Sequence, residues 1–466
     1  MSLTLSPLDI FGGSYTDDTK AFDLQDCVNY IPEPAEDPKA RAKGVLRGAP
    51  GLKLFKALGG SFGSRGWHNC EGTLFVVNGT TLYEIQPDSS AIARGTVTGT
   101  GPVDMEHNQI AGGNELAIFT GSDGFVWNTY AKTFVQITDD AFPGGFSAGY
   151  IDSYICAVEP LGRYWFTSDL ANATSYDGTN RYSAESAPDA ILGLLVSHSQ
   201  VWVFGSRTIE QFQDTGANDI TFQTNKGSVI EKGAAGRYCF ARMDNTIYWL
   251  GNDGIVYSAA GGTAAVRVST HAVEQDIDGR DLANVKAFVW IDRGHSVLYL
   301  DFPDGHTWGF DASAGLWHRR QSHGLTRWRV NDIIAWNGGW YGTDFANGNI
   351  YKIDWDEYTE NGEPLVAMRR TSYLSSNQNR VKNSAVELVM DTGHGPVDGE
   401  SCVNLRYSDD NGYTWSNYRQ ILLNDISNRG FRVRFTRLGS FYQRVYEIMV
   451  SSNVKKDIVS ASGSFE

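Results

Sequence analysis

The sequence predicts an all-β protein: a β-propeller of six or seven irregular blades, followed by a C-terminal antiparallel β-sheet or sandwich. Short apolar strands joined by tight turns recur about seven times, at steps of roughly 38 to 50 residues, the range expected for a four-stranded blade. Between residues 67 and 355 the hydrophobic pattern alternates with almost no helical periodicity. The pattern changes after Pro364, which predicts the second region.

The clearest repeated unit is LFVVNGTTLYEI, from Leu74 to Ile85, in which Asn78-Gly79 separates two short strands. Asn and Gly accept the positive φ angles of a tight hairpin turn. Six further hairpins of this kind are predicted, starting at Leu116, Tyr154, Val201, Ile247, Val297 and Trp340. Because one such unit cannot bury both of its faces, successive units are expected to stack.

Residues 1–66 are predicted to form an N-terminal arm and an entry or closure segment. The run from Cys27 to Phe55 combines a short apolar stretch with three prolines and a Gly-Ala-Pro-Gly turn. One interpretation is a strand that closes the propeller, since the first and last blades of a closed ring must be joined. The other is an extended segment that lies on a partner subunit.

Residues 67–364 are assigned to the propeller repeats, and they carry large aromatic residues at related positions in successive units. A large side chain at a repeated position fills a repeated gap, so packing between blades is favoured over a platform for a cofactor or a sugar. These residues include Trp127, Trp165, Trp202, Trp249, Trp308 and Trp340.

Residues 365–466 are predicted to form a β-rich region that is relatively basic. It contains 13 Lys/Arg and 10 Asp/Glu, whereas the preceding residues contain 26 and 44. Arg432 and Arg434 are expected on one face of a strand with Val433 on the other, and Arg437 follows them. These arginines are either a solvated face or an intersubunit or adaptor contact, in which the Arg fork would bind carboxylates.

One local motif matches the Asp-box pattern S-x-D-x-G-x-T-W, which resembles the hairpin turns of sialidases and other sugar-acting propellers. In this hairpin the Asp side chain accepts amide hydrogen bonds and the Trp packs beneath, so a structural role is predicted. The motif occurs once and outside the repeats. Its residues are Ser408, Asp410, Gly412 and Trp415.

Composition excludes several classes of function. Five scattered cysteines without a CxxC pair favour buried thiols in a reducing compartment over disulfides or a zinc site. The histidine spacing predicts no metal site, and nothing predicts a cofactor. The formal charge of −15 argues against a protein that grips nucleic acid by its phosphates. No apolar run is long enough to cross a bilayer, and without a secretion signal at its start the chain is expected to be made in a cytoplasm.

The sequence does not predict an enzyme. It contains no GxSxG elbow, HExxH helix or GxxxxGK[ST] loop. A glycosidase would need two carboxylates across a cleft, and no pair is selected by the sequence.

In order along the chain, four features resemble the tail hub or nozzle proteins of short-tailed bacteriophages, also called packaged-DNA stabilisation proteins or podovirus tail accessory factors. They are VNYIPEP (28–34), GAPGL (48–52), the hairpin WHNCEGTLFVVNGTTLYEI (67–85), and VNLRYSDDNGYTWSN (403–417) followed by FYQRVYEI (441–448).

This resemblance implies a structural virion protein made in the host cytoplasm and located in the tail. Such a subunit forms a homohexameric ring below the portal and its adaptor, extends the DNA channel and helps to retain packaged DNA. The implied partners are further copies of itself, the portal-adaptor protein and the tail needle or tailspikes, with DNA passing through unbound. The alternative is a carbohydrate-binding or carbohydrate-active, sialidase-like propeller.

Overall fold

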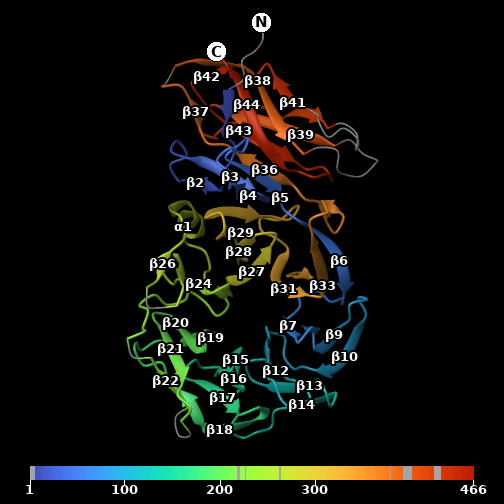
Figure 1. Cartoon of the computed structure of the whole chain (residues 1–466), viewed down its shortest axis with the longest axis vertical. Coiled ribbons are helices and arrows are strands. Elements are labelled where there is room, and N and C mark those ends of the chain that lie inside the picture. Colours follow the sequence, from blue (N-terminus) through green and yellow to red (C-terminus); the bar gives the residue numbers. More distant parts are fainter. Residues whose placement is uncertain are drawn as a thin grey trace.

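The structure is a computed structural model that describes residues 6–217, 221–225, 227–261, 264–377, 379–391, 401–423 and 432–466. Over these residues strands dominate, with one helix, α1 (His271–Ile277). Figure 1 shows a ring of sheets with a second β-rich body attached to its rim. The all-β prediction is therefore confirmed.

The ring is a propeller of seven four-stranded blades in the described part of the chain. The innermost strands contact one another in chain order. The innermost strand of the last blade contacts that of the first, which closes the ring.

The strands of each blade are named from the innermost to the outermost. Blades 1 to 3 are β7 (Gly66–Cys70), β8 (Thr73–Asn78), β9 (Thr81–Ile85), β10 (Ala91–Thr96); β11 (Asp104–His107), β12 (Glu115–Phe119), β13 (Gly124–Asn128), β14 (Thr133–Gln136); β15 (Phe146–Ile151), β16 (Tyr154–Val158), β17 (Trp165–Asp169), β18 (Asn172–Tyr182). Blades 4 and 5 are β19 (Ile191–Ser197), β20 (Gln200–Gly205), β21 (Ile209–Asp214), β22 (Phe222–Thr224); β23 (Phe240–Met243), β24 (Thr246–Leu250), β25 (Val256–Ala259), β26 (Val266–Arg267). Blades 6 and 7 are β27 (Lys286–Asp292), β28 (His295–Asp301), β29 (Thr307–Asp311), β30 (Leu316–Arg320); β31 (Val330–Trp336), β32 (Gly339–Asp344), β33 (Asn349–Asp354), β6 (Gly51–Ala57).

Each of the seven predicted hairpins forms the second and third strands of one blade. The local pattern of two apolar strands and a turn is sufficient to place them, because antiparallel neighbours pair within a few residues of sequence. Of the predicted alternatives of six and seven blades, the topology gives seven.

Strand β6 closes the propeller, since it comes from the N-terminal part of the chain and completes blade 7. It pairs antiparallel with β33, with Leu52 opposite Ile353. Gly51 is required at the start of β6, because a Cβ there would lie 2.3 Å from the carbonyl oxygen of Thr359. A short hairpin, β34 (Thr359–Glu360) and β35 (Glu363–Pro364), continues this sheet beyond β6.

The second body is a sandwich of two sheets that combine strands from both ends of the chain. One sheet has the order β4-β5-β44-β38-β41, with β1 on β44 and β42 on β38. Its strands are β1 (Ser6–Leu8), β4 (Tyr30–Pro34), β5 (Gly44–Gly48), β38 (Val381–Met390), β41 (Arg432–Thr436), β42 (Ser440–Phe441) and β44 (Ile458–Phe465). The other sheet contains β2 (Tyr15–Thr16), β3 (Leu24–Val28), β36 (Ala367–Arg370), β37 (Leu374–Ser375), β39 (Cys402–Ser408), β40 (Arg419–Leu422) and β43 (Gln443–Val450).

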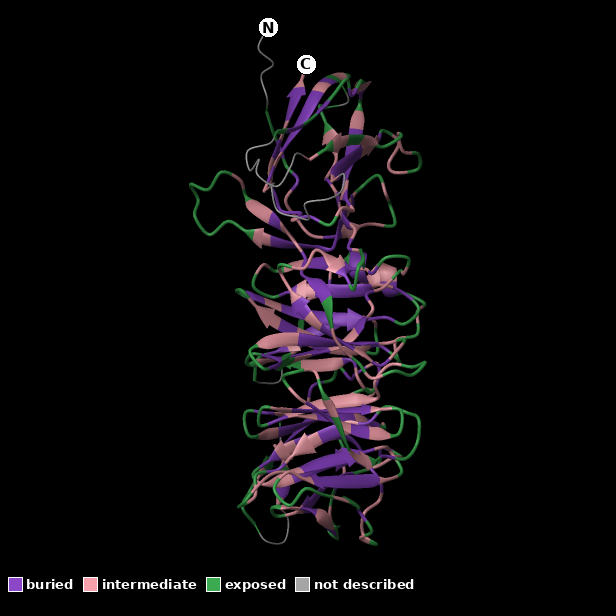
Figure 2. Cartoon of the chain, turned by 90° about the vertical axis from the view of Figure 1, so that its right-hand side faces the viewer, coloured by how far each residue is buried: buried purple, intermediate pink, exposed green. Residues whose placement is uncertain are grey.

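This second sheet does not end at the sandwich, because β3 pairs in parallel with β30 of blade 6. Blade 6 and the sandwich therefore share one 11-stranded sheet. Nine of its strands follow the order β27-β28-β29-β30-β3-β36-β43-β39-β40, while β2 pairs with β3 and β37 with β43 beside this path. Leu8, Tyr30 and Leu46 are buried in the sandwich core beside Phe435 and Ile448. Figure 2 shows buried residues throughout both bodies. The N-terminal strands thus hold the propeller and the sandwich together.

Candidate functional site

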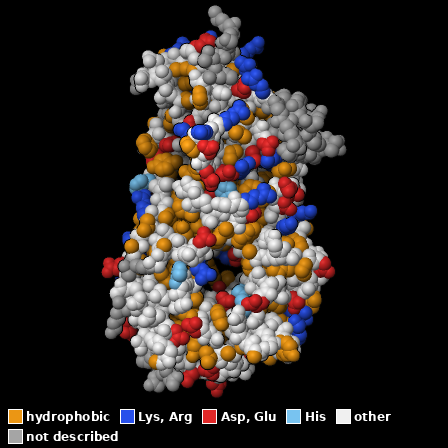
Figure 3. All heavy atoms as spheres, viewed as in Figure 1, with side chains coloured by type: hydrophobic (Ala, Val, Ile, Leu, Met, Phe, Trp, Pro, Cys, Tyr) orange, Lys and Arg blue, Asp and Glu red, His pale blue; other side chains and the backbone are white. Residues whose placement is uncertain are grey.

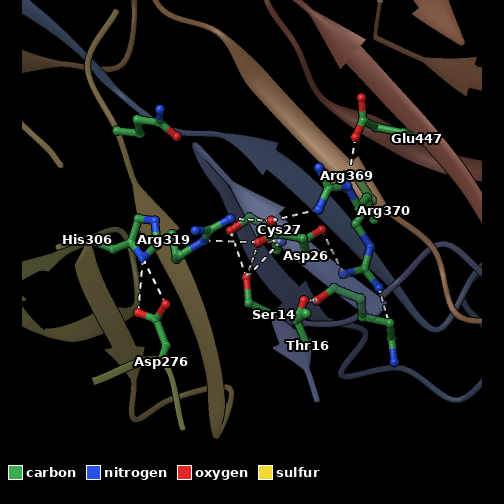
Figure 4. A network of polar contacts seen from close by, with 12 residues as sticks. Ser14, Thr16, Asp26, Cys27, Asp276, His306, Arg319, Arg369, Arg370 and Glu447 are labelled. Atoms are coloured by element: carbon green, nitrogen blue, oxygen red, sulfur yellow. Dashed lines mark hydrogen bonds and ion pairs between the residues drawn. The ribbon is translucent and has the colours of Figure 1, made fainter. Parts of the chain in front are cut away.

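The junction between propeller and sandwich is organised around Asp26, a buried carboxylate on β3 (Figure 4). Its oxygens accept hydrogen bonds from Arg319 on β30, at 3.1 Å from Nε, and from the Ser14 hydroxyl at 3.0 Å. Arg370 on β36 lies 3.7 Å away from the same carboxylate. Asp26 therefore joins strands of the propeller, the N-terminal region and the sandwich.

The electrostatics of the junction favour ionised side chains. Burial opposes ionisation of Asp26, but the charges of Arg319 and Arg370 outweigh it, and the pKa of Asp26 is lowered. Glu447 on β43 receives hydrogen bonds from Arg370 (2.7 Å) and Arg406 (2.6 Å). Its pKa is also lowered against the opposing effect of burial. A charge-assisted network of this kind keeps its geometry because each buried charge depends on the others.

The neighbouring Arg369 fixes the start of the chain to the sandwich. This fully buried guanidinium donates to the backbone carbonyl oxygens of Ile10 (2.8 Å) and Gly13 (2.7 Å), and to Gln25 Oε1 at 2.6 Å. Burial lowers its pKa. Asn29 makes a similar link, because its side-chain amide donates to the carbonyl oxygens of residues 321 and 366.

The Asp-box residues lie in a hydrogen-bonded turn between β39 and β40. The Asp410 carboxylate accepts from the Thr414 amide (2.8 Å) and hydroxyl (2.6 Å), and Ser408 Oγ accepts from the Gly412 amide at 2.9 Å. The hydrogen bonds from Thr414 lower the pKa of Asp410 to about 2. These polar groups are therefore used within the hairpin.

The same hairpin also packs against the junction. Trp415 lies beside the guanidinium groups of Arg370 and Arg406. The Cζ atoms of these two arginines are 5.3 and 4.8 Å from the centroid of the Trp415 ring. A Cβ on Gly412 would lie 2.4 Å from Leu24 Cδ2, so the hairpin rests directly on the N-terminal segment. In this fold the Asp-box positions an aromatic ring over the arginines that bind Glu447.

The three arginines singled out in the sequence lie on the sandwich. Arg432 and Arg434 are exposed on one face of β41, and Val433 and Phe435 are buried on the other. Arg432 donates to Glu387 at 2.6 and 2.9 Å. Over the residues whose placement is described, Arg434 and the exposed Arg437 have no side-chain hydrogen bond or ion pair.

A cleft between the propeller rim and the sandwich gathers charged residues from distant parts of the sequence, which no local pattern groups together. Arg47 pairs with Glu33 (2.7 Å) and Asp457 (3.2 Å). Lys456 donates to the carbonyl oxygens of Tyr358 and Val454, and burial lowers its pKa to about 8. The cleft is thus an internally paired seam between the two bodies.

One group of described side chains has donor atoms close enough together to hold a metal ion: His68, Glu106 and His107, on the inner edge of blades 1 and 2. The sequence prediction missed this cluster because 37 residues separate His68 from Glu106. Their shared position on the innermost strands of successive blades is the signal that would have found it. All five cysteines are buried and free. No helix in the described ranges is long and apolar enough to span a membrane.

Two family profiles match the chain in order. One, described as Bacteriophage P22 Gp10, beta-propeller, matches residues 6–358, and one described as Bacteriophage P22 Gp10, beta-sandwich, matches residues 367–462. A curated relative, the tail hub protein gp10 of Salmonella phage P22, is 25% identical over 352 residues, which are 70% of each chain.

Solved structures with similar folds are more distant. Virginiamycin B lyase from Staphylococcus aureus is 8% identical, with a TM-score of 0.47, over 65% of this chain and 98% of its own. The extracellular domain of the putative hybrid two component system BT4673 from B. thetaiotaomicron is 11% identical, with a TM-score of 0.46, over 80% of this chain and 47% of its own.

Proposed function

The chain belongs to the bacteriophage P22 Gp10 family, and from this membership we propose that it is a structural subunit of a phage tail hub and a component of the virion. The relative's name, tail hub protein, supports this role and a non-enzymatic one. Assembly in the tail with other phage proteins follows from the same proposal.

In finer detail, the subunit forms a homohexameric ring below the portal-adaptor, extends the DNA channel and helps to retain packaged DNA. It also carries the tail needle or the tailspikes. The genome passes through the lumen without specific binding, because net negative charge disfavours contact between phosphates and the wall. The Asp-box gives no support to the carbohydrate-active alternative, since its polar groups are used inside the turn.

The observation that carries the proposal is the 11-stranded sheet that runs from blade 6 into the sandwich. A ring subunit under pressure from packaged DNA needs its two bodies to move as one. The shared sheet and the ion pair of Asp26 supply that rigidity, since the backbone pairing of β3 with β30 and the contact between Asp26 and Arg319 both cross the junction.

The contact between neighbouring subunits is assigned to the basic face of the sandwich. A closed ring with identical subunits requires a heterologous interface, in which one patch meets a different patch on the next copy. Arg434 and Arg437 are exposed and unpaired within the described residues, and residues 1–364 carry the acidic excess. Opposite charges on the two patches would orient the encounter.

The test is the mass of the purified full chain by light scattering, alone and with the portal-adaptor complex of the same phage. A defined ring, either alone or on the complex, is expected. Arg434→Glu and Arg437→Glu together should abolish it, whereas Arg163→Glu, an exposed arginine on the propeller, should not. A wild-type chain that stays monomeric and never joins the complex would refute the assembly role.

A further inference from the structure

A cluster of ligand-type side chains lies where blade 1 meets blade 2 at the propeller axis. His68 is on β7, and Glu106 and His107 are on β11, and these two innermost strands contact each other. All three side chains are only partly buried. Figure 3 shows a hollow at the centre of the ring with histidine and charged side chains at its rim. Solvent ions therefore reach this part of the protein.

The donor atoms of the cluster are already arranged around one point. His68 Nε2 lies 2.7 Å from His107 Nδ1, and Glu106 Oε1 lies 3.5 and 3.4 Å from these two nitrogens. In a tetrahedral zinc site with bonds of about 2.0 to 2.2 Å, donor atoms are roughly 3.3 to 3.6 Å apart. The two distances to Glu106 Oε1 have this value. The distance between the two ring nitrogens would reach it if the imidazole rings moved apart by about 0.6 Å.

Neighbouring groups orient these donors. The His107 backbone amide donates to Glu106 Oε1 at 3.0 Å, which fixes the carboxylate. On the other side of the His107 ring, Nε2 lies 3.6 Å from Glu71 Oε1, which Gln109 also contacts. Histidines that bind a metal usually direct their second ring nitrogen toward a carboxylate. Glu71 occupies that position.

We propose that His68, Glu106 and His107 bind one divalent transition-metal ion of the zinc type, which links blades 1 and 2 at the inner edge of the propeller. Two imidazoles and one carboxylate suit Zn²⁺ or Co²⁺, whereas Mg²⁺ and Ca²⁺ prefer oxygen ligands alone. Water completes the coordination from the central hollow. The site does not depend on the proposed hexameric assembly, because all of its ligands come from one chain.

The test is a Co²⁺ titration of the full chain, which is prepared without a histidine tag and freed of metal by a chelator. One ion per chain is expected, with the visible absorption of a low-coordinate Co²⁺ site, and Zn²⁺ should displace it. His68→Asn and Glu106→Gln should each weaken binding by more than about tenfold, and Glu71→Gln by about tenfold. His271→Asn is the control, an exposed histidine beside Glu274 on α1, and should bind as wild type does.

Thermal unfolding with and without Zn²⁺ separates loss of the site from loss of the fold. Zn²⁺ should raise the melting temperature of the wild type and of His271→Asn, but not that of Glu106→Gln. Glu106→Gln with a wild-type melting temperature in chelator would show that the fold is intact. No saturable Co²⁺ binding to the wild type, or equal binding to wild type and Glu106→Gln, would overturn the proposal.

Discussion

At the scale of single residues, Asp26 is expected to have a large effect on stability. Its carboxylate faces Arg319 and Arg370, and both guanidinium groups are largely removed from solvent. Replacing Asp26 by Asn keeps the volume but leaves the Arg319 guanidinium without its carboxylate, and Arg370 with Glu447 alone. Removing one member of a buried ion pair typically costs about 3 to 5 kcal/mol in the free energy of unfolding.

Asp26→Asn is therefore expected to lower the urea midpoint strongly at neutral pH. Glu363→Gln, at an exposed position without a partner in the described residues, should change the free energy by less than about 0.5 kcal/mol. The folded-state pKa of Asp26 is lowered, so its contribution is fully present above the unfolded value of 3.8 and is lost as pH falls through the folded value. The difference between wild type and variant should accordingly narrow below about pH 4. A constant difference down to pH 2 would contradict this account.

No pattern in the sequence indicates the role of Asp26. The motif Leu24–Val28 indicates only a short strand, and Arg319 lies 293 residues away. Charged pairs between distant segments leave no periodic signal in one sequence. The exposed face of Arg432 and Arg434, in contrast, follows directly from the alternation of side chains along a strand.

At the scale of elements, the Asp-box hairpin connects a local turn to the junction. Gly412 has a φ of 78°, and a Cβ at this position would collide with the buried Leu24. Gly439 has a φ of 79°, and a Cβ there would meet no atom within 4 Å. Alanine at Gly439 should cost about 1 kcal/mol, because only the backbone is strained. Alanine at Gly412 should cost about 1 to 3 kcal/mol more, because the methyl group also overpacks against Leu24.

Scanning calorimetry of the two variants measures this difference directly. Equal melting temperatures for Gly412→Ala and Gly439→Ala would mean that the hairpin does not press on the N-terminal segment. The pair is matched because both glycines lie in the sandwich and have nearly the same φ angle.

Elements differ in how well the sequence predicts them. The seven hairpins were predictable because each forms between adjacent segments with a turn signal. The partners of β3 and β5 were not, since these strands pair with segments hundreds of residues later, and the closing role of β6 was only one of two interpretations. The prolines and glycines around β4 to β6 indicated extended chain, but no local rule selects which distant edge such a chain joins.

At the scale of the whole molecule, the sandwich is not an independent unit of sequence. Residues 365–466 lack β1, β3, β4 and β5, and buried core residues such as Leu8, Tyr30 and Leu46 come from outside this range. Expressed alone, residues 365–466 are expected to show no cooperative thermal transition by circular dichroism. Adding residues 1–50 through a flexible linker should restore one. Cooperative unfolding of residues 365–466 alone would contradict this prediction.

The closing strand and the junction also determine when the chain can fold during synthesis. Blade 7 cannot be completed by β6 until β33 has left the ribosome. The pairing of β3 with β36, and of β36 with β43, becomes possible later still. Contacts between such distant segments form slowly, because the loop must be ordered before they form. The apolar N-terminal strands thus lack these distant partners, and stay exposed to aggregation or to chaperones, until translation is nearly finished. A prematurely terminated chain would lack these partner strands, and only full-length subunits would acquire the native surface for assembly.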